Sequence, residues 1–211
     1  MTDSIPFLSL HKKELKVFSR LTSPVKIQNF LDSLSYNDEE RYRCPQNVLL
    51  DNKAHCYDGA VFAAAALQMI GYPPLLVEML PNNRDDDHIL AVFRQKKCWG
   101  ALAKSNFVGL RYREPVYKNM RELVMSYFDS YYNIAGERTL IGYTAPLNLN
   151  RFNKFNWLEN DDTMDTIAKA LDSTSKYRII TPAIARKLTH VDVRSYKAGL
   201  MGSKRSGLFN P

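Results

Sequence analysis

The chain has 211 residues, of which 45% are hydrophobic, and a formal net charge of +7. Its length suits one large domain, or one domain with a small appendage, and its apolar content is enough for a core. The absence of a long uncharged run argues against a membrane span, and the N-terminal residues do not read as a secretory signal. Three cysteines without CxxC spacing argue against a disulfide framework or a zinc site and predict a protein of the reducing cytoplasm.

The basic surplus lies near the C-terminus. Residues 173–211 contain eight Lys or Arg and a single acid, Asp192, whereas acids and bases balance over residues 1–172. We therefore expect one domain over residues 1–172 and a basic extension over 173–211. Such an extension can bind nucleic acid, an acidic lipid surface or an acidic partner, or it can simply be solvated.

Two helices are predicted first, together forming a packing layer over residues 10–34. The first covers residues 10–21, and the second starts at a Ser-Pro pair, residues 23–24, which reads as an N-cap followed by the first helical position. Residues 35–53 are polar and are expected to be irregular, broken by Pro45.

Residues 54–71 predict one buried helix that carries Cys56 in its first turn. The run is apolar on nearly every face, and Gly71 ends it. A thiol at a helix start feels unpaired N–H groups and the positive end of the dipole, which favour the nucleophilic thiolate. The alternative is a buried structural cysteine that acts as a small hydrophobe.

Three strands are expected after this helix. They cover residues 75–80, residues from His88 to 93 and residues 98–103, with a loop over 81–87 and a tight turn at 95–97. Short apolar runs bounded by turn residues are typical of strands, and the last two runs predict an antiparallel hairpin.

The remainder is predicted to be mainly helical after residue 115. We expect an amphipathic helix over 119–131, a long loop over 143–160, short helices over 163–171 and after 181–182, and a loose stretch over 199–211. The elements together predict an α+β fold. A buried helix that begins with a cysteine packs on an antiparallel sheet, with helices before and after.

Cysteine catalysis needs a thiolate, an oriented base and donors for the oxyanion. Cys56 can supply the first. His88 opens a strand, and its ring can meet the helix start if that strand packs along the helix. His55 suits this role less well, because adjacent helix residues point to different faces. The orienting group is expected at the end of the neighbouring strand, at Ser105 or Asn106.

Three segments carry a family resemblance: HCYDGAVFAAAALQMIGYPP, DDDHILAVF and CWGALAKSN. In this order, over roughly residues 45–110, the chain resembles the transglutaminase-like branch of the papain-like fold. The resemblance implies a Cys-His-Asp triad that performs acyl transfer on amides, with Cys56 as nucleophile and His88 as base.

The third triad position departs from that pattern. The branch has Asp four residues after the Trp, and here Ala103 follows Trp99 at that spacing. Asn106 would give the Cys-His-Asn pattern of papain-like proteases, and its amide oxygen can accept from an imidazole N–H. Ser105 keeps the strand parity of Trp99, so both residues remain candidates.

Further residues are weighed as binding groups. Gln46 is either an oxyanion donor, as a glutamine is in papain-like proteases, or a polar loop residue. Trp99, Arg111 and Arg113 are candidate substrate-binding residues, and the two arginines could hold an acidic group or form a salt-bridged strand. Residues 84–88 offer oxygen ligands beside an imidazole, but successive loop residues rarely converge on a metal, so neither a metal nor a cofactor is expected.

The function predicted from these residues is cysteine-dependent acyl transfer on an amide or ester of a peptide or small molecule. Hydrolysis is favoured over transamidation, because water is always available. Two alternatives remain open: a transglutaminase-like binding module without catalysis, and docking on nucleic acid or an acidic partner through the basic extension.

Overall fold

The computed structural model describes residues 12–211 and has an α+β architecture. The helices are α1 (Lys12–Phe18), α2 (Pro24–Ser33), α3 (Pro45–Asp51), α4 (Cys56–Met69), α5 (Met120–Met125), α6 (Asp162–Asp172), α7 (Pro182–Ala185) and α8 (Val193–Gly199). Short 3₁₀ helices lie at Val108–Leu110, Phe128–Ser130, Leu149–Phe155 and Arg205–Gly207. The strands are β1 (Ser35–Tyr36), β2 (Lys53–Ala54), β3 (Leu75–Pro81), β4 (His88–Gln95), β5 (Cys98–Leu102), β6 (Arg113–Tyr117), β7 (Leu140–Thr144), β8 (Leu147–Asn148) and β9 (Lys176–Arg178).

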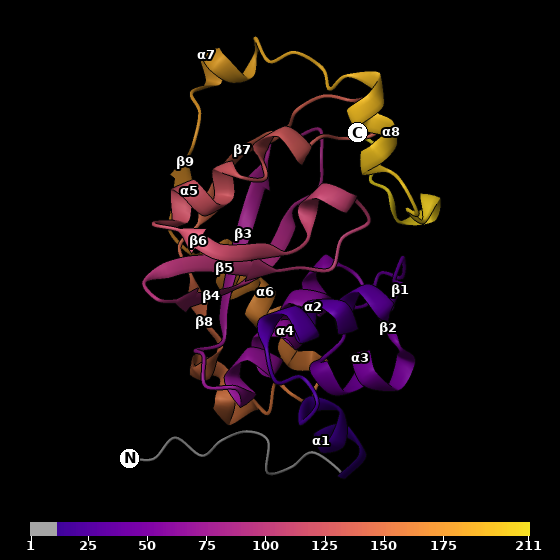
Figure 1. Cartoon of the computed structure of the whole chain (residues 1–211), viewed down its shortest axis with the longest axis vertical. Helices are drawn as coiled ribbons and strands as arrows, with labels where there is room; N and C mark the ends of the chain where they lie inside the picture. The colour runs from indigo at the N-terminus through magenta and orange to yellow at the C-terminus, as the bar shows by residue number, and fades with distance from the viewer. Residues whose placement is uncertain (1–11) are drawn as a thin grey trace.

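The main sheet is antiparallel throughout the described residues, in the order β6-β5-β4-β3-β7-β9, with β8 also beside β3. A short parallel pair, β1 and β2, lies apart from it, near α3 (Figure 1). Because β3 and β4 are central, the residues that open β4 lie inside the fold and not at a sheet edge.

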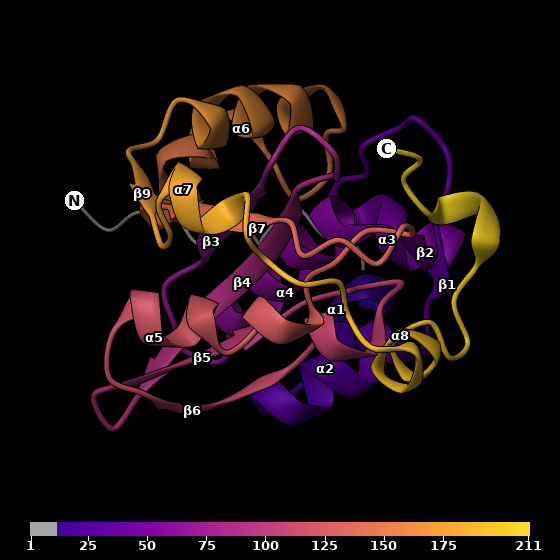
Figure 2. The ribbon, with the colours of Figure 1, turned by 90° about the horizontal axis from the view of Figure 1, so that it is seen from above.

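The two faces of the main sheet have separate cores, and helices lie on both faces (Figure 2). On one face α4 packs on β4, with α2, α3 and α6 around it. On the other face α5 and the segment after it cover β5 and β6. Strand alternation places Ile89 and Ala91 in the first core and Leu90 and Val92 in the second.

Helix α4 is buried from Tyr57 to Leu67. The Phe62 ring stacks on Phe18 and on Phe30, with centroid separations of 5.1 and 5.0 Å. Gly59 lies so close to Lys104 that an added Cβ would collide with that side chain. None of the helices in the described part of the chain has the length and apolar character needed to cross a bilayer.

The α+β class, the buried helix that begins with a cysteine, and the antiparallel hairpin are confirmed. Ser23 caps α2, with Pro24 at its first position, also as predicted. Pro45 does not break the chain, because it occupies the first turn of α3, where a missing N–H costs nothing. The first two residues of the predicted helix 10–21 lie outside the described residues.

Two segments differ from expectation. The helix predicted over 119–131 ends at Met125, and the chain continues as turns whose tyrosines are anchored elsewhere: Tyr127 donates to Arg111 O at 2.8 Å and Tyr131 to Asp86 O at 2.9 Å. The segment 143–160, expected as a loop, contains the end of β7, all of β8 and a 3₁₀ helix.

The C-terminal stretch is in contact with the rest of the chain. β9 pairs with β7 at the edge of the main sheet. Residues 199–211, expected to be loose, include a 3₁₀ turn at which Gly207 packs against the Tyr36 ring. The domain division at residue 172 stays a prediction, but the structure shows that part of the basic extension completes the sheet.

Candidate functional site

Cys56 occupies the first position of α4, and the residues around it fix that helix start. His55 is the N-cap, and its Nδ1 accepts from Tyr57 N at 3.0 Å. The Asp58 carboxylate accepts from His55 N at 3.4 Å and from Arg43 N at 2.8 Å. This reciprocal capping satisfies N–H groups that a helix start leaves open, and it sets the direction of the cysteine side chain.

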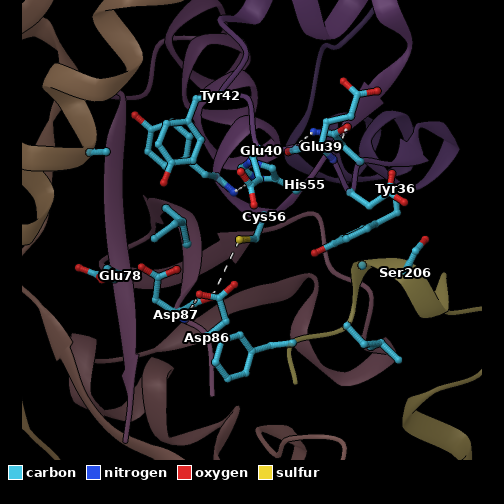
Figure 3. Close-up of a pocket in the computed structure, with 18 of the residues that line it drawn as sticks. Tyr36, Glu39, Glu40, Tyr42, His55, Cys56, Glu78, Asp86, Asp87 and Ser206 are labelled. Carbon is cyan, nitrogen blue, oxygen red and sulfur yellow. Dashed lines mark hydrogen bonds between the residues drawn. The ribbon is translucent and has the colours of Figure 1, made fainter. Parts of the chain in front are cut away.

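Two cavities meet at Cys56. The first, about 310 Å³, is called the acidic cavity here because it is lined by seven carboxyl side chains: Asp38, Glu39, Glu40, Glu78, Asp86, Asp87 and Asp172. The second, about 60 Å³, is called the histidine cavity and is lined by Cys56, His88, Ser105 and Asn106 among others. Cys56 points from the start of α4 toward Asp86 and Asp87 (Figure 3).

The Cys56 thiol is held in its neutral form. Its sulfur lies 4.0 Å from the backbone oxygen of Asp87. Burial raises the pKa of Cys56 well above its ordinary value, and the charges of Asp87 and Asp86 raise it further, whereas a backbone hydrogen bond from Ile89 opposes them. The helix-start effect expected from the sequence is therefore outweighed by burial and acidic neighbours.

His88 is buried, with 5% of its surface exposed, and its ring is held by a hydrogen bond to a backbone carbonyl. Its Nε2 lies 2.8 Å from Leu110 O. A carbonyl only accepts, so Nε2 carries the proton and Nδ1 is left unprotonated. Burial lowers the pKa of His88 to about 4, against a smaller effect of the Leu110 contact, so the ring is neutral at pH 7.

Cys56 and His88 line the same cavity but are not hydrogen-bonded. Strand parity places the His88 side chain on the side of Leu90 and Val92, opposite the face that α4 covers. Within residues 12–211, no hydrogen bond or ion pair joins the two side chains. The structure thus holds a neutral thiol and a neutral imidazole in the lining of the histidine cavity.

Neither predicted third member orients His88. Ser105 Oγ accepts from Phe107 N at 3.0 Å. Asn106 pairs with the Lys204 backbone, Nδ2 donating to the carbonyl oxygen and Oδ1 accepting from the amide, both at 2.7 Å. The chain turns after β5, so these two side chains form contacts within their own loop and with the C-terminal segment. The His88 ring is oriented by the Leu110 carbonyl instead.

Two other candidates lie away from Cys56. Gln46, the predicted oxyanion donor, is in α3, where its N–H donates to Leu158 O at 2.9 Å, and it lines neither cavity. Trp99 pairs with Arg94 near the hairpin turn, at the end of the sheet opposite to His88. The Arg94 guanidinium lies 5.7 Å from the Trp99 ring centroid, so this indole packs against its own hairpin.

The two arginines proposed as substrate ligands have structural partners. Arg113 donates through Nε to Ser126 Oγ at 3.0 Å and through Nη2 to Gly109 O at 2.8 Å, and its guanidinium lies 3.8 Å from the Tyr127 ring centroid. Arg111 forms an ion pair with Asp32 at 3.2 Å. Neither residue lines the acidic or the histidine cavity.

Two features of the site were not predicted from the sequence: its acidic character and the C-terminal segment that forms part of its wall. Glu78 stands alone as a charge in the apolar strand LLVEML, a signal that could have marked it. The C-terminal residues 206–209 also line the acidic cavity. Lys204 Nζ forms an ion pair with Asp38 at 2.7 Å, which holds this segment at the cavity. Among the described residues, no group of three or more His, Cys, Asp or Glu forms a metal site.

The buried carboxyls predict that the free energy of unfolding falls as the pH rises from about 6.5 to about 8. Burial raises the pKa of Glu78 to about 8 and that of Asp58 to about 7, so the folded state holds protons that the unfolded state has released. Burial lowers the pKa values of His55 and His88 to about 4, so these two residues have the opposite effect on stability. That opposite effect is confined to pH values below about 6.5. Urea midpoints across this range measure the effect.

Glu78→Gln is the matched variant for this measurement, because it removes the titration and keeps the size. The decline with pH should become shallower in that variant. A midpoint that rises between pH 6.5 and 8 in the wild type contradicts the prediction.

The similarity of this chain to known proteins is weak. No protein-family model and no curated protein matches the chain. Legionella pneumophila LapG is similar at 13% identity and a TM-score of 0.40, covering 81% of this chain and 95% of that one. EGTA-treated LapG from the same organism is similar at 16% identity and a TM-score of 0.35, covering 49% and 69%. At these TM-scores neither similarity assigns the chain to a family or an activity.

Proposed function

We propose that this protein is a cysteine-dependent acyl-transfer enzyme of the transglutaminase-like type, which hydrolyses an amide or ester. The observation that carries the proposal is the arrangement at the histidine cavity. A thiol at the first position of a capped, buried helix shares this cavity with a neutral imidazole whose Nδ1 is free of its proton. A nucleophile, a base and a group that orients the base are the parts that such chemistry requires.

The reaction follows from these groups. The Cys56 sulfur forms a bond to the substrate carbonyl carbon while its proton moves to Nδ1 of His88. The N–H of a first helical residue has no acceptor inside the helix, so that of Cys56 is available to the oxyanion. His88 returns the proton to the leaving amine or alcohol. Water then adds to the thioester, and its hydrolysis restores the thiol.

The experiment traps the acyl-enzyme. The protein is incubated with p-nitrophenyl acetate, and intact-mass and peptide mass spectrometry locate the added acetyl group. We expect transient acetylation of Cys56 and release of nitrophenol beyond one equivalent. The Cys56→Ser variant should lose both, and Cys98→Ser, another partly exposed cysteine, should keep both. Acetylation of Cys98 alone, or none, removes the enzyme proposal.

One observation favours the alternative of a binding module without catalysis. The pKa of Cys56 is raised, so in the absence of a ligand the thiol is not activated. A module of this kind would bind its ligand at the acidic cavity and release no nitrophenol, and Cys56→Ser would bind as well as the wild type.

A further inference from the structure

We propose that the acidic cavity binds the positively charged side chain of a lysine or arginine in a peptide substrate. This inference rests on the proposed function, because it names the substrate class for that same site. It assigns Glu78, Asp86 and Asp87 as the residues that recognise the charge.

The charge of the cavity is the first observation. Seven carboxyl side chains line it; Asp38 and Glu39 are ion-paired with basic residues, and the other five have no ion pair with a basic side chain among the described residues. The chain as a whole carries a net charge of +7, so this concentration of acids is opposite in sign to the molecule. A cleft lined by charges of one sign focuses the field and attracts a ligand of the other sign.

Glu78 provides the second, independent observation. The residue is 4% exposed, and although its carboxyl is hydrogen-bonded with that of Asp87, its buried Oε2 receives no hydrogen bond from an N–H or hydroxyl donor among the described residues. It lies beside Asp87, with Asp86 close by, on the cavity wall below Cys56 (Figure 3). A buried polar atom left without a partner is costly, and a donor from a ligand would remove that cost.

The three carboxyls also perturb one another. Burial, and then a hydrogen bond with Asp87, raise the pKa of Glu78 to about 8, and burial together with the charge of Asp87 raises the pKa of Asp86 to about 6. A cation placed between them would lower the cost of burying the carboxylates and the repulsion between Asp86 and Asp87. Ammonium and guanidinium groups bring several N–H donors and form the strongest hydrogen bonds with carboxylates.

The walls suit the stem of a long side chain. Tyr42 and Tyr57 lie with ring centroids 4.5 Å apart, and both line the cavity together with Tyr36. Aromatic faces pack against methylene groups and attract cations. The volume of about 310 Å³ lies at the lower end of ligand sites, and it admits one extended side chain.

A basic side chain fits better than a metal ion. The acids come from four segments of the chain, and in the described residues no three of them converge as a ligand set. A flexible ammonium or guanidinium accepts such a spread arrangement, whereas a divalent cation needs its oxygens at fixed short distances.

Binding of this kind would also prepare the nucleophile. After burial, the charges of Asp87 and Asp86 contribute most to the raised pKa of Cys56. When a cation neutralises them, the thiol loses its proton to His88 more readily. The substrate would thereby activate the cysteine that attacks it.

The test measures binding without chemistry, in the Cys56→Ser variant, by calorimetry at low salt. The probes are Nα-acetyl-lysine amide and Nα-acetyl-arginine amide, with Nα-acetyl-norleucine amide as the neutral analogue. We expect at least one cationic probe to bind about tenfold or more tightly than norleucine. Glu78→Gln in the same background should weaken that probe about tenfold, whereas Glu114→Gln, an exposed residue outside the cavity, should not.

Because the reactive sulfur is absent, this result is independent of whether the wild type turns over. Equal binding of norleucine, or cation binding that Glu78→Gln leaves unchanged, overturns the proposal. So does stabilisation by calcium ions with no binding of either cationic probe. The melting temperature of each variant is recorded, and Asp86→Asn replaces Glu78→Gln if the latter does not fold.

Discussion

Replacing His88 by alanine is expected to lower kcat/KM for ester hydrolysis by about 10²–10⁴-fold, the usual contribution of a general base. The imidazole is neutral and its Nε2 proton is donated to Leu110 O, so Nδ1 is the nitrogen that accepts the Cys56 proton in the proposed reaction. Without the ring, the thiol keeps its raised pKa and little thiolate is present at pH 7. The measurement is the initial rate with p-nitrophenyl acetate over pH 6–9.5.

The pH profile separates a catalytic role from a structural one. Activity of the variant should recover in part at high pH, where hydroxide generates the thiolate without a base. His190→Ala is the control, since His190 is exposed and lines neither cavity. If His88→Ala has the wild-type rate at pH 7 while it remains folded, His88 is not the base.

Truncating Phe62 to alanine should give the largest loss of stability, about 3–5 kcal/mol. The ring is fully buried in α4 and stacks on Phe18 and Phe30, so its removal leaves a void where three elements meet. For a protein of this size the melting temperature should fall by roughly 6–20 °C. Calorimetry or urea denaturation measures it.

Phe155→Ala is the matched control for this truncation. The Phe155 ring is 45% exposed, and its loss should shift the melting temperature little. Phe62→Leu should recover much of the stability, because it refills most of the void. A wild-type melting temperature for Phe62→Ala would mean that α4 is not held by this stack.

The sequence was most informative where its signals are local. The apolar run after Cys56, the end at Gly71 and the hairpin turn at residues 95–97 each depend on neighbours within a few positions. Their elements appear nearly where predicted. β7 was missed although Leu140, Gly142 and Thr144 alternate with less buried residues, because the alternation is short and includes a glycine.

The site was harder to predict because its contacts are distant in sequence. The group that orients His88 is a backbone carbonyl, and a carbonyl has no residue-type signature. Asn106 had the chemistry of a triad member, but its partner is the Lys204 backbone. The neutral state of Cys56 depends on burial and on Asp87 and Asp86, which only the folded chain brings to the thiol.

The pairing of Asn106 with Lys204 joins residues 98 positions apart. A chain leaves the ribosome from its N-terminus at about 5–20 residues per second. Helix α4 and the β4–β5 hairpin therefore emerge seconds before the segment that pairs with Asn106 and lines the acidic cavity. During that interval a nascent chain exposes its cysteine on the side that residues 206–209 later cover, and the cavity wall is complete only after that segment has been synthesised.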